Sequence, residues 1–321
     1  MSKYNIGDLR QRQALPLKAK ILLTQKRIRE FYEHYDGKVY ISFSGGKDST
    51  VLLHIAREIY PHIKAVYCDT GLEFPEIKEH VKTFDDVDII RPEKSFRQVI
   101  EMYGWVYPSK EVAHHLYGLK NGAKYAIEIF KGNNINGEQS KFKQRYIKWA
   151  GLANAPFTIS DKCCKEMKKK PLKKYEKQSG NSPITGTTAE ESQLRQTSWL
   201  RYGCNIYDSQ RTISRPLSIW TEQDILRYIV DNNLKISSVY GEIKENNEGH
   251  LRTTGEDRTG CMFCLIGCHL EKGGRRRFVR MKHTHPQIYE YCMEQLKMRE
   301  ILDYIQKYTK CEPLYDDLTL F

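Results

Sequence analysis

The sequence Ser44-Gly45-Gly46-Lys47-Asp48-Ser49-Thr50 lies between two segments of different periodicity and decides which fold we expect. Residues 38–43 before it are β-branched and aromatic, which predicts a buried strand. Residues 51–59 after it carry apolar side chains at helical spacing. The stretch, called the glycine-rich loop below, is therefore expected to turn the chain sharply from a strand into a helix.

The glycine-rich loop has the features of an anion site. Glycine permits a positive φ and a close approach of another group. The first amides of the helix lack intrahelical partners and lie at the positive end of its dipole, which favours phosphate or sulfate. Lys47 is expected to add a mobile positive charge, and three hydroxyls add donors, on Ser44, Ser49 and Thr50. The alternative is a glycine-rich turn in which a serine or an aspartate only caps the helix. The stretch does not match the Walker pattern G-x-x-x-x-G-K-[ST].

Strands and helices are expected to alternate along the rest of the chain. The expected strands are residues 63–68, 87–90, 182–186 and 211–217, and the expected helices are 75–84, 95–103 and 221–230. This alternation predicts an α/β fold with a doubly wound, mainly parallel sheet. Ligands bind beyond the carboxyl ends of such strands, so Asp69 and Thr70 should face the same pocket as the glycine-rich loop. Thr221 and Asp224 have the spacing of a capping box.

Three segments are expected along the chain. Residues 1–36 should form an N-terminal helical segment, and residues 37–232 an α/β domain with a helical insertion at about 104–158. Residues 233–321 should form a cysteine-rich loop and C-terminal helices, at about 285–295 and 298–308, packed on the same domain.

Composition narrows the class of partner. The chain has 321 residues, of which 40% are hydrophobic, and no apolar run approaches membrane-spanning length. It starts without the apolar core of a signal peptide, so we expect a soluble, cytoplasmic protein without a membrane partner. The net charge of +12 favours an anionic partner such as a nucleotide or a nucleic acid, although a solvated basic surface has the same composition.

The expected insertion interleaves basic and aromatic residues. They are Lys110, Lys120, Lys124, Lys131, Lys141, Lys143, Arg145 and Lys148, among Tyr117, Tyr125, Phe130, Phe142, Tyr146 and Trp149. Such a pattern can hold single-stranded nucleic acid, and it also fits amphipathic helices with a solvated face. Together with Arg275 to Arg277, it is expected to form a basic wall around the nucleotide pocket.

Four of the nine cysteines form two pairs, Cys163-Cys164 and Cys261-x-x-Cys264. Four thiolates can hold a [4Fe-4S] cluster or zinc, and composition does not choose between them. Cys268 is an alternative ligand in place of one of the adjacent cysteines. The third interpretation is a set of buried cysteines without a ligand.

These motifs together resemble a known family. The glycine-rich loop matches S-G-G-x-D-S, the PP-loop of ATP pyrophosphatases and of relatives of phosphoadenosine phosphosulfate (PAPS) reductase. The further matching pieces are 69–75, Cys163-Cys164 with 168–172, Thr185-Gly186 with Glu191-Ser192, Arg215-Pro216-Leu217 with Trp220-Thr221, and 261–264. From about residue 38 to 305, the chain resembles the PAPS reductase family of the adenine-nucleotide α-hydrolase-like superfamily.

The resemblance implies a site for an adenine nucleotide, either ATP with Mg²⁺ or adenylyl sulfate or PAPS. It implies nucleotide contacts from Ser44, Gly45, Gly46, Lys47, Asp48, Ser49, Thr50, Asp69, Thr70, Gly186, Glu191 and Arg215, with Lys47 and Asp48 also catalytic. The cysteine pattern is similar to that of adenylyl sulfate reductases, which implies a [4Fe-4S] cluster more than zinc at Cys163, Cys164, Cys261 and Cys264.

Three positions differ from the family's reductases. The PP-loop is complete, as in ATP pyrophosphatases. Thr188 stands where a sulfate-binding arginine is expected, and Cys311 lies in Lys-Cys-Glu-Pro where the reductases have E-C-G-x-H. These differences favour ATP-dependent sulfur transfer to an acceptor such as tRNA or DNA, with a sulfur donor such as a cysteine desulfurase and Cys268 as a relay. Two alternatives stay open: a sulfonucleotide reductase in which Cys311 attacks the nucleotide sulfur, and a nucleic-acid-binding regulatory module without turnover.

Overall fold

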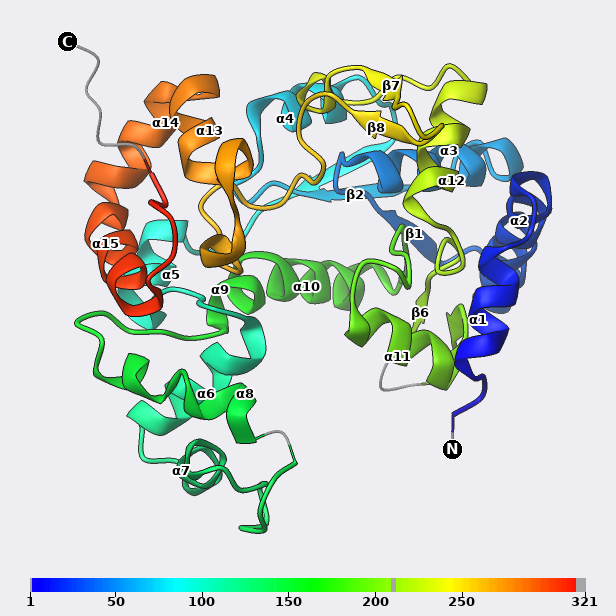
Figure 1. Cartoon of the computed structure of the whole chain (residues 1–321). Helices are drawn as coiled ribbons and strands as arrows, with labels where there is room; N and C mark the ends of the chain where they lie inside the picture. Colours follow the sequence, from blue (N-terminus) through cyan, green and yellow to red (C-terminus); the bar gives the residue numbers. More distant parts are fainter. Residues whose placement is uncertain (1, 142, 209–211, 316–321) are drawn as a thin grey trace. The chain divides into compact units, whose positions relative to one another are not determined.

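A six-stranded sheet is the centre of the fold in this computed structural model, which describes residues 2–141, 143–208 and 212–315. The strands are ordered β3-β2-β1-β4-β6-β5, of which β2, β1 and β6 are labelled in Figure 1. Their bounds are β1 Val39–Ser42, β2 Ala65–Cys68, β3 Val87–Ile90, β4 Ser182–Thr185, β5 Asn205–Ile206 and β6 Ile213–Ser214. Neighbouring strands are parallel except β5, which is antiparallel to β6. The predicted α/β fold with a mainly parallel sheet is therefore confirmed. The expected strand start at Arg211 lies outside the described residues.

Side chains of β1 alternate between two helical layers, as the pleat of a strand requires. Val39 and Ile41 belong to the core that includes Leu52 and Ile55 of α3 (Lys47–Ile59). Tyr40 points the other way, and its ring packs at 5.2 Å from that of Tyr175 in α10 (Lys170–Ser179). Helices α3 and α10 accordingly lie on opposite sides of the sheet (Figure 1).

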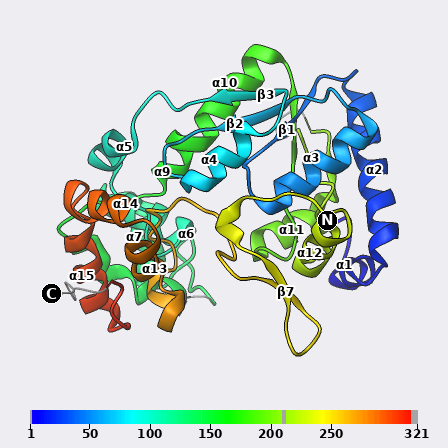
Figure 2. The same cartoon turned by 90° about the horizontal axis from the view of Figure 1, so that it is seen from above.

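Two further helices cover α3, as Figure 2 shows from above. They are α2 (Leu17–His34) and α12 (Glu222–Asp231), which bury Ile28 and Ile225. The predicted cap of α12 is confirmed, because the Asp224 amide donates to Thr221 Oγ1 at 3.3 Å and the Thr221 amide donates to Asp224 Oδ2 at 2.7 Å.

The chain divides into two compact units. The sheet unit comprises Met1–Asp69, Glu73–Arg91 and Pro171–Thr259, and the cysteine unit comprises Thr70–Leu72, Pro92–Lys170 and Gly260–Phe321. These boundaries differ from the expected segments. The N-terminal helices α1 (Ile6–Gln13) and α2 belong with the sheet because Leu9 and Phe31 are part of its core. The expected insertion belongs with the C-terminal residues.

The sheet unit also contains elements that the sequence patterns did not predict. They are α11 (Gln193–Tyr202), the edge strand β5, and an antiparallel hairpin of β7 (Ile243–Glu245) and β8 (Leu251–Thr253). The helix predicted at 75–84 is α4 (Pro75–Lys82).

The cysteine unit is mostly helical. Its helices are α5 Phe96–Tyr103, α6 Lys110–Lys120, α7 Lys124–Lys131, α8 Lys143–Ile147, α9 Lys162–Cys164, α13 Arg277–Thr284, α14 Pro286–Glu290 and α15 Met298–Thr309. A π-helical turn, Tyr291–Gln295, continues α14, so the two expected C-terminal helices are present. In the described part of the chain, no helix is long and apolar enough to cross a lipid bilayer.

Candidate nucleotide site and cysteine cluster

The glycine-rich loop has the predicted place between β1 and the N-terminus of α3. Gly45 has a φ of +72°, and a β-carbon there would lie 2.7 Å from a methyl of Val81 and 2.8 Å from one of Ile77. A side chain at this position would therefore clash and strain the backbone, which explains the glycine. Gly46 is the residue before the helix, in an extended conformation, so the first amides of α3 follow the turn directly.

All three loop hydroxyls bond within the loop, and Ser44 Oγ accepts from the Gly46 amide at 3.4 Å. Ser49 Oγ donates to the Gly46 carbonyl at 2.9 Å, and Thr50 Oγ1 does so at 3.1 Å. Both side chains are buried, whereas Ser44 is exposed and its hydroxyl lies 3.0 Å from that of Ser49. Ser49 and Thr50 thus hold the shape of the turn, and Ser44 presents its hydroxyl to solvent.

Lys47 is held in place by acidic and carbonyl groups. The side chain is only 3% exposed, and Nζ lies 3.1 Å from Glu222 Oε1 and 3.7 Å from Asp48 Oδ2. Nζ also donates to the carbonyl of Asp257 at 3.3 Å. The expectation of a mobile positive charge is therefore wrong, because burial and these partners fix the amine.

Tyr240 caps the first helical amide. Its hydroxyl accepts a hydrogen bond from the Lys47 amide at 3.1 Å and lies 2.7 Å from Thr259 Oγ1. The Lys47 ammonium lies 5.6 Å from the centre of the Tyr240 ring. Sequence reasoning missed Tyr240, Glu222 and Thr259 as neighbours of the loop, because none of them belongs to a short motif that includes Lys47.

Asp48 is a carboxyl with a shifted pKa. Burial raises the pKa of Asp48 to about 6, with the carboxylates of Glu222 and Glu191 adding to the effect and the charges of Lys47 and Arg258 opposing it. The site therefore combines several carboxylates with two cations. Carboxylate oxygens of this kind are the protein ligands that Mg²⁺ accepts beside nucleotide phosphates.

Gly186 and Glu191 follow β4 in the sequence and lie next to the glycine-rich loop. A β-carbon on Gly186 would lie 2.9 Å from the carbonyl oxygen of Asp48, so only glycine permits this approach. Glu191 accepts from the Thr188 amide at 3.1 Å and pairs with Arg258 at 2.9 Å and with Arg195. Thr188, at the position where the family's reductases have an arginine, is buried.

The other predicted nucleotide contacts have partners of their own. Asp69, at the carboxyl end of β2, pairs with Lys78 at 2.8 Å and Arg91 at 3.4 Å. The Arg215 guanidinium donates to Ser198 Oγ at 2.7 Å. Thr70 belongs to the cysteine unit, where its hydroxyl accepts from the Leu72 amide at 3.3 Å.

The cysteines of the predicted cluster all belong to the cysteine unit. Cys163 is part of α9. Burial raises its pKa, and the nearby thiols of Cys164, Cys261 and Cys264 add to this rise. The positive charge of Lys168 opposes it. The two pairs are therefore neighbours in space although they are far apart in the sequence. In the described residues, no three His, Cys, Asp or Glu side chains have an arrangement that would hold a metal ion as they stand.

Cys268 and Cys311 are neighbours as well. Burial raises the pKa of Cys268 to about 12, Arg277 opposes this, and the charges of Glu271, Cys311 and Cys264 add to it. Tyr107 is close to both thiols. Burial is the main cause of its raised pKa, and the two thiols add to the rise. Cys268 is thus a protonated thiol at neutral pH.

Arg277 binds the loop that carries the Cys-x-x-Cys pair. Its guanidinium donates to the carbonyls of Cys264 at 2.7 Å and Ile266 at 3.0 Å, and it pairs with Glu271. The predicted role of Arg277 in an open basic wall is therefore wrong, because its donors are used inside the unit. Arg276 similarly donates to the Pro313 carbonyl at 2.5 Å.

Several aromatics of the predicted insertion are core residues. Phe130 and Trp149 are buried, and Tyr146 donates to Glu111 at 2.5 Å. Arg145 pairs with the same glutamate and Lys131 pairs with Glu128. Phe142 lies outside the described residues. These contacts match amphipathic helices with a solvated face better than a series of stacking platforms.

The fold and the loop define a nucleotide-binding α/β protein of the adenine-nucleotide α-hydrolase-like type. The model of the phosphoadenosine phosphosulfate reductase domain family matches residues 38–118 and 123–273, so the chain belongs to this family.

Three relatives share 24% identity with the chain. Two are uncharacterized proteins of Methanocaldococcus jannaschii, aligned over 84% and 82% of this chain and 51% and 42% of their own lengths. The third, adenosine 5'-phosphosulfate reductase of Lysinibacillus sphaericus, is aligned over 67% of this chain and 73% of its own length. The chain thus spans about half the length of the two uncharacterized relatives.

Among solved structures, the PAPS reductase of Candida auris in a phosphate complex aligns with 67% of this chain and 82% of its own, at 15% identity and a TM-score of 0.40.

Proposed function

We propose that this protein binds ATP with Mg²⁺ at the glycine-rich loop and uses it to adenylylate an acceptor, as the first half of a sulfur transfer. The observation that carries the proposal is the complete Ser-Gly-Gly-Lys-Asp-Ser turn between β1 and α3, with Asp48, Glu191 and Glu222 beside it. Helix amides and Lys47 suit the pyrophosphate portion of ATP, and the carboxylates suit Mg²⁺.

The proposed reaction has two displacements. An acceptor oxygen attacks the α-phosphorus, the bond from that phosphorus to the bridging oxygen breaks, and pyrophosphate leaves with its electron pair. A sulfur nucleophile, hydrosulfide in its simplest form, then displaces AMP and leaves sulfur in place of the acceptor oxygen. Positioning and charge stabilisation by Lys47, the loop amides and Mg²⁺ supply the catalysis.

The same proposal includes a [4Fe-4S] cluster held by Cys163, Cys164, Cys261 and Cys264, with zinc as the alternative metal. Four neighbouring thiols are the donor set that such a cluster takes, and the charge of Lys168 opposes the raised pKa of Cys163. When bound, the cluster would supply a redox-active or sulfur-binding centre. Cys268, which has a raised pKa, is outside this ligand set.

The nucleotide half of the proposal is tested by ATP binding and pyrophosphate release. Lys47→Ala should weaken ATP binding by about 1.5–3 kcal/mol, the scale of a hydrogen bond to a charged group. Lys82→Ala is the matched control, since Lys82 is an exposed lysine of α4 that pairs with Glu79. Unchanged ATP affinity and turnover in Lys47→Ala would overturn the assignment.

The metal half is tested by anaerobic purification with iron and sulfide assays. Serine at Cys261 or Cys264 should remove the iron–sulfur absorbance, whereas serine at Cys204, which belongs to the sheet unit, should retain it. Zinc without iron in the anaerobic protein would contradict the cluster.

A sulfonucleotide reductase is the second candidate function, because one relative is an adenosine 5'-phosphosulfate reductase. In this case Cys311 would attack the nucleotide sulfur. Sulfite release from adenylyl sulfate that is lost in Cys311→Ser, without pyrophosphate release from ATP, would favour it. Salt-sensitive nucleic acid binding without either reaction would instead indicate a regulatory module.

A further inference from the structure

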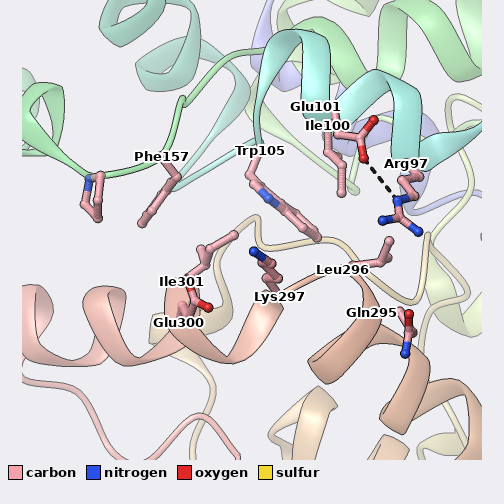
Figure 3. Close-up of a pocket in the computed structure, with 11 residues that line it drawn as sticks. Arg97, Ile100, Glu101, Trp105, Phe157, Gln295, Leu296, Lys297, Glu300 and Ile301 are labelled. Atoms are coloured by element: carbon pink, nitrogen blue, oxygen red, sulfur yellow. Dashed lines mark hydrogen bonds and ion pairs between the residues drawn. The ribbon is translucent and has the colours of Figure 1, made fainter.

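The cysteine unit contains a cavity of about 410 Å³ between α5 and the start of α15 (Figure 3). This volume falls in the range of small-molecule sites, about 300–1,000 Å³. Its apolar surface comes from Ile100, Trp105, Phe157, Leu296 and Ile301. Figure 3 shows Trp105 and Phe157 directed into the same space from one side and Lys297 from the other.

Four charged residues line the cavity. Arg97 and Glu101 form an ion pair at 3.0 Å on one edge. Lys297, the residue before α15, and Glu300, in its first turn, are exposed and have no ion-pair partner among the described residues. An apolar, aromatic space with one available cation and one available carboxylate suits a flat ligand that carries an anionic group and a hydrogen-bond donor.

Lys297 lies between the π-helical turn and α15, directly before the first residue of that helix. Its φ is +54°, in the left-handed region. Lys310, at the other end of α15, has the same φ but does not line the cavity, so it offers a matched comparison.

We infer that this cavity binds one nucleotide unit of a single-stranded nucleic acid, with the base against Phe157, which is partly exposed beside the buried Trp105, and the phosphate at Lys297. Base–aromatic contact combined with a nearby cation is the usual chemistry of single-strand binding. The carboxylate of Glu300 can accept a hydrogen bond from an exocyclic amino group, which favours cytosine or adenine over thymine or uracil. The net charge of +12 is consistent with a polyanionic partner.

The cavity is connected to both cysteine pairs through neighbouring residues. The Trp105 ring lies 5.6 Å from Phe96, which lies 5.9 Å from Phe263 in the Cys-x-x-Cys segment. On its backbone side, the Trp105 carbonyl accepts from the Ser160 amide at 2.8 Å, three residues before Cys163. The inference rests on the proposed function only in assigning this nucleotide as the acceptor of sulfur. Binding itself is independent of ATP.

Fluorescence anisotropy with labelled single strands of about 12 nucleotides tests the inference at low salt. We expect Phe157→Ala to weaken binding roughly tenfold and Phe157→Tyr to retain most of it, because tyrosine keeps a stacking ring. Lys297→Gln should weaken binding about threefold and Lys310→Gln should leave it unchanged. Strands of dC or dA should bind more tightly than dT, and Glu300→Gln should reduce that preference.

The same proteins are titrated with ATP and with AMP. Competition by AMP that depends on Phe157 and Lys297 would support the nucleotide chemistry and assign it to a free mononucleotide instead of a strand. Oligonucleotide affinity that is equal in folded Phe157→Ala, folded Lys297→Gln and wild-type protein would overturn the inference. Lys47→Ala should lose ATP binding but keep oligonucleotide binding, so failure of the proposed function and failure of this inference are distinguishable.

Discussion

At the glycine-rich loop, single hydrogen bonds decide which groups are available to a ligand. The Lys47 amide, which would serve a phosphate, already donates to Tyr240, and the Lys47 amine is paired with Glu222. A nucleotide phosphate therefore has to compete with a hydroxyl and a carboxylate. Tyr240 and Glu222 are positioning residues of the site in this sense.

The role of Tyr240 gives a prediction with a clear sign. Tyr240→Phe should raise the affinity for ATP about two- to tenfold, because it removes the hydroxyl that occupies the Lys47 amide and one neutral hydrogen bond contributes about 0.5–1.5 kcal/mol. Isothermal titration calorimetry measures the change. A lower affinity would mean that the hydroxyl contacts the nucleotide.

Asp48 gives a pH dependence. Because the pKa of Asp48 is about 6, its carboxyl is mostly protonated at pH 5 and ionised at pH 7. Only the carboxylate binds Mg²⁺, so the affinity for Mg²⁺–ATP should rise roughly tenfold from pH 5 to 7. Asp48→Asn should remove this rise and serves as the control for the titration of ATP itself. An equal pH profile in both proteins would contradict the prediction.

The raised pKa of Asp48 has the opposite effect on the stability of the fold, which should fall, not rise, with increasing pH. A carboxyl whose pKa is higher in the folded than in the unfolded state stabilises the fold most below its unfolded pKa, 3.8 for Asp48. This contribution is lost as the pH rises through about 6.

At the scale of elements, α12 depends on its cap. The Thr221 hydroxyl accepts from the Asp224 amide, and the helix that follows buries Leu226 and Tyr228. Because α12 begins with Glu222, the cap also determines where the partner of Lys47 lies.

Thr221→Ala should lower the free energy of unfolding by about 0.5–2 kcal/mol, since the N-terminal amides lose their acceptor. Thr221→Ser keeps the oxygen and should cost much less. Urea denaturation of both variants checks this. Equal losses would show that the methyl group, and not the cap, matters.

At the scale of the whole molecule, charge sets the response to salt. The chain carries 52 basic and 40 acidic side chains, and several of the basic ones are paired internally. If about three phosphates are neutralised, the affinity for a single strand should fall more than tenfold between about 50 and 200 mM salt. Lys297→Gln should make the slope of log affinity against log salt shallower by about 0.7. A slope that is equal in wild type and variant would place the phosphate contact elsewhere.

Local patterns in the sequence determined the sheet, the strand-to-helix turn and the cap of α12. Residue preferences, hydrophobic periodicity and the spacing of Thr221 and Asp224 act over a few residues, so they can be read without knowing the fold. The short strands and the β7–β8 hairpin escaped prediction because they are three residues or fewer and lack a sustained period.

Tertiary structure alone decided the surroundings of the site. The Lys47 amide and the Tyr240 hydroxyl are 193 positions apart, and no local pattern relates them. The same holds for the pairing of Lys47 with Glu222 and for the approach of Cys163-Cys164 to Cys261 and Cys264. Burial of Lys47 follows from packing, because a lysine in a glycine-rich turn is expected to be solvated until distant acidic groups surround it. The sequence therefore specified which residues carry the chemistry, and the packing of distant segments decided which of them are paired, buried or exposed.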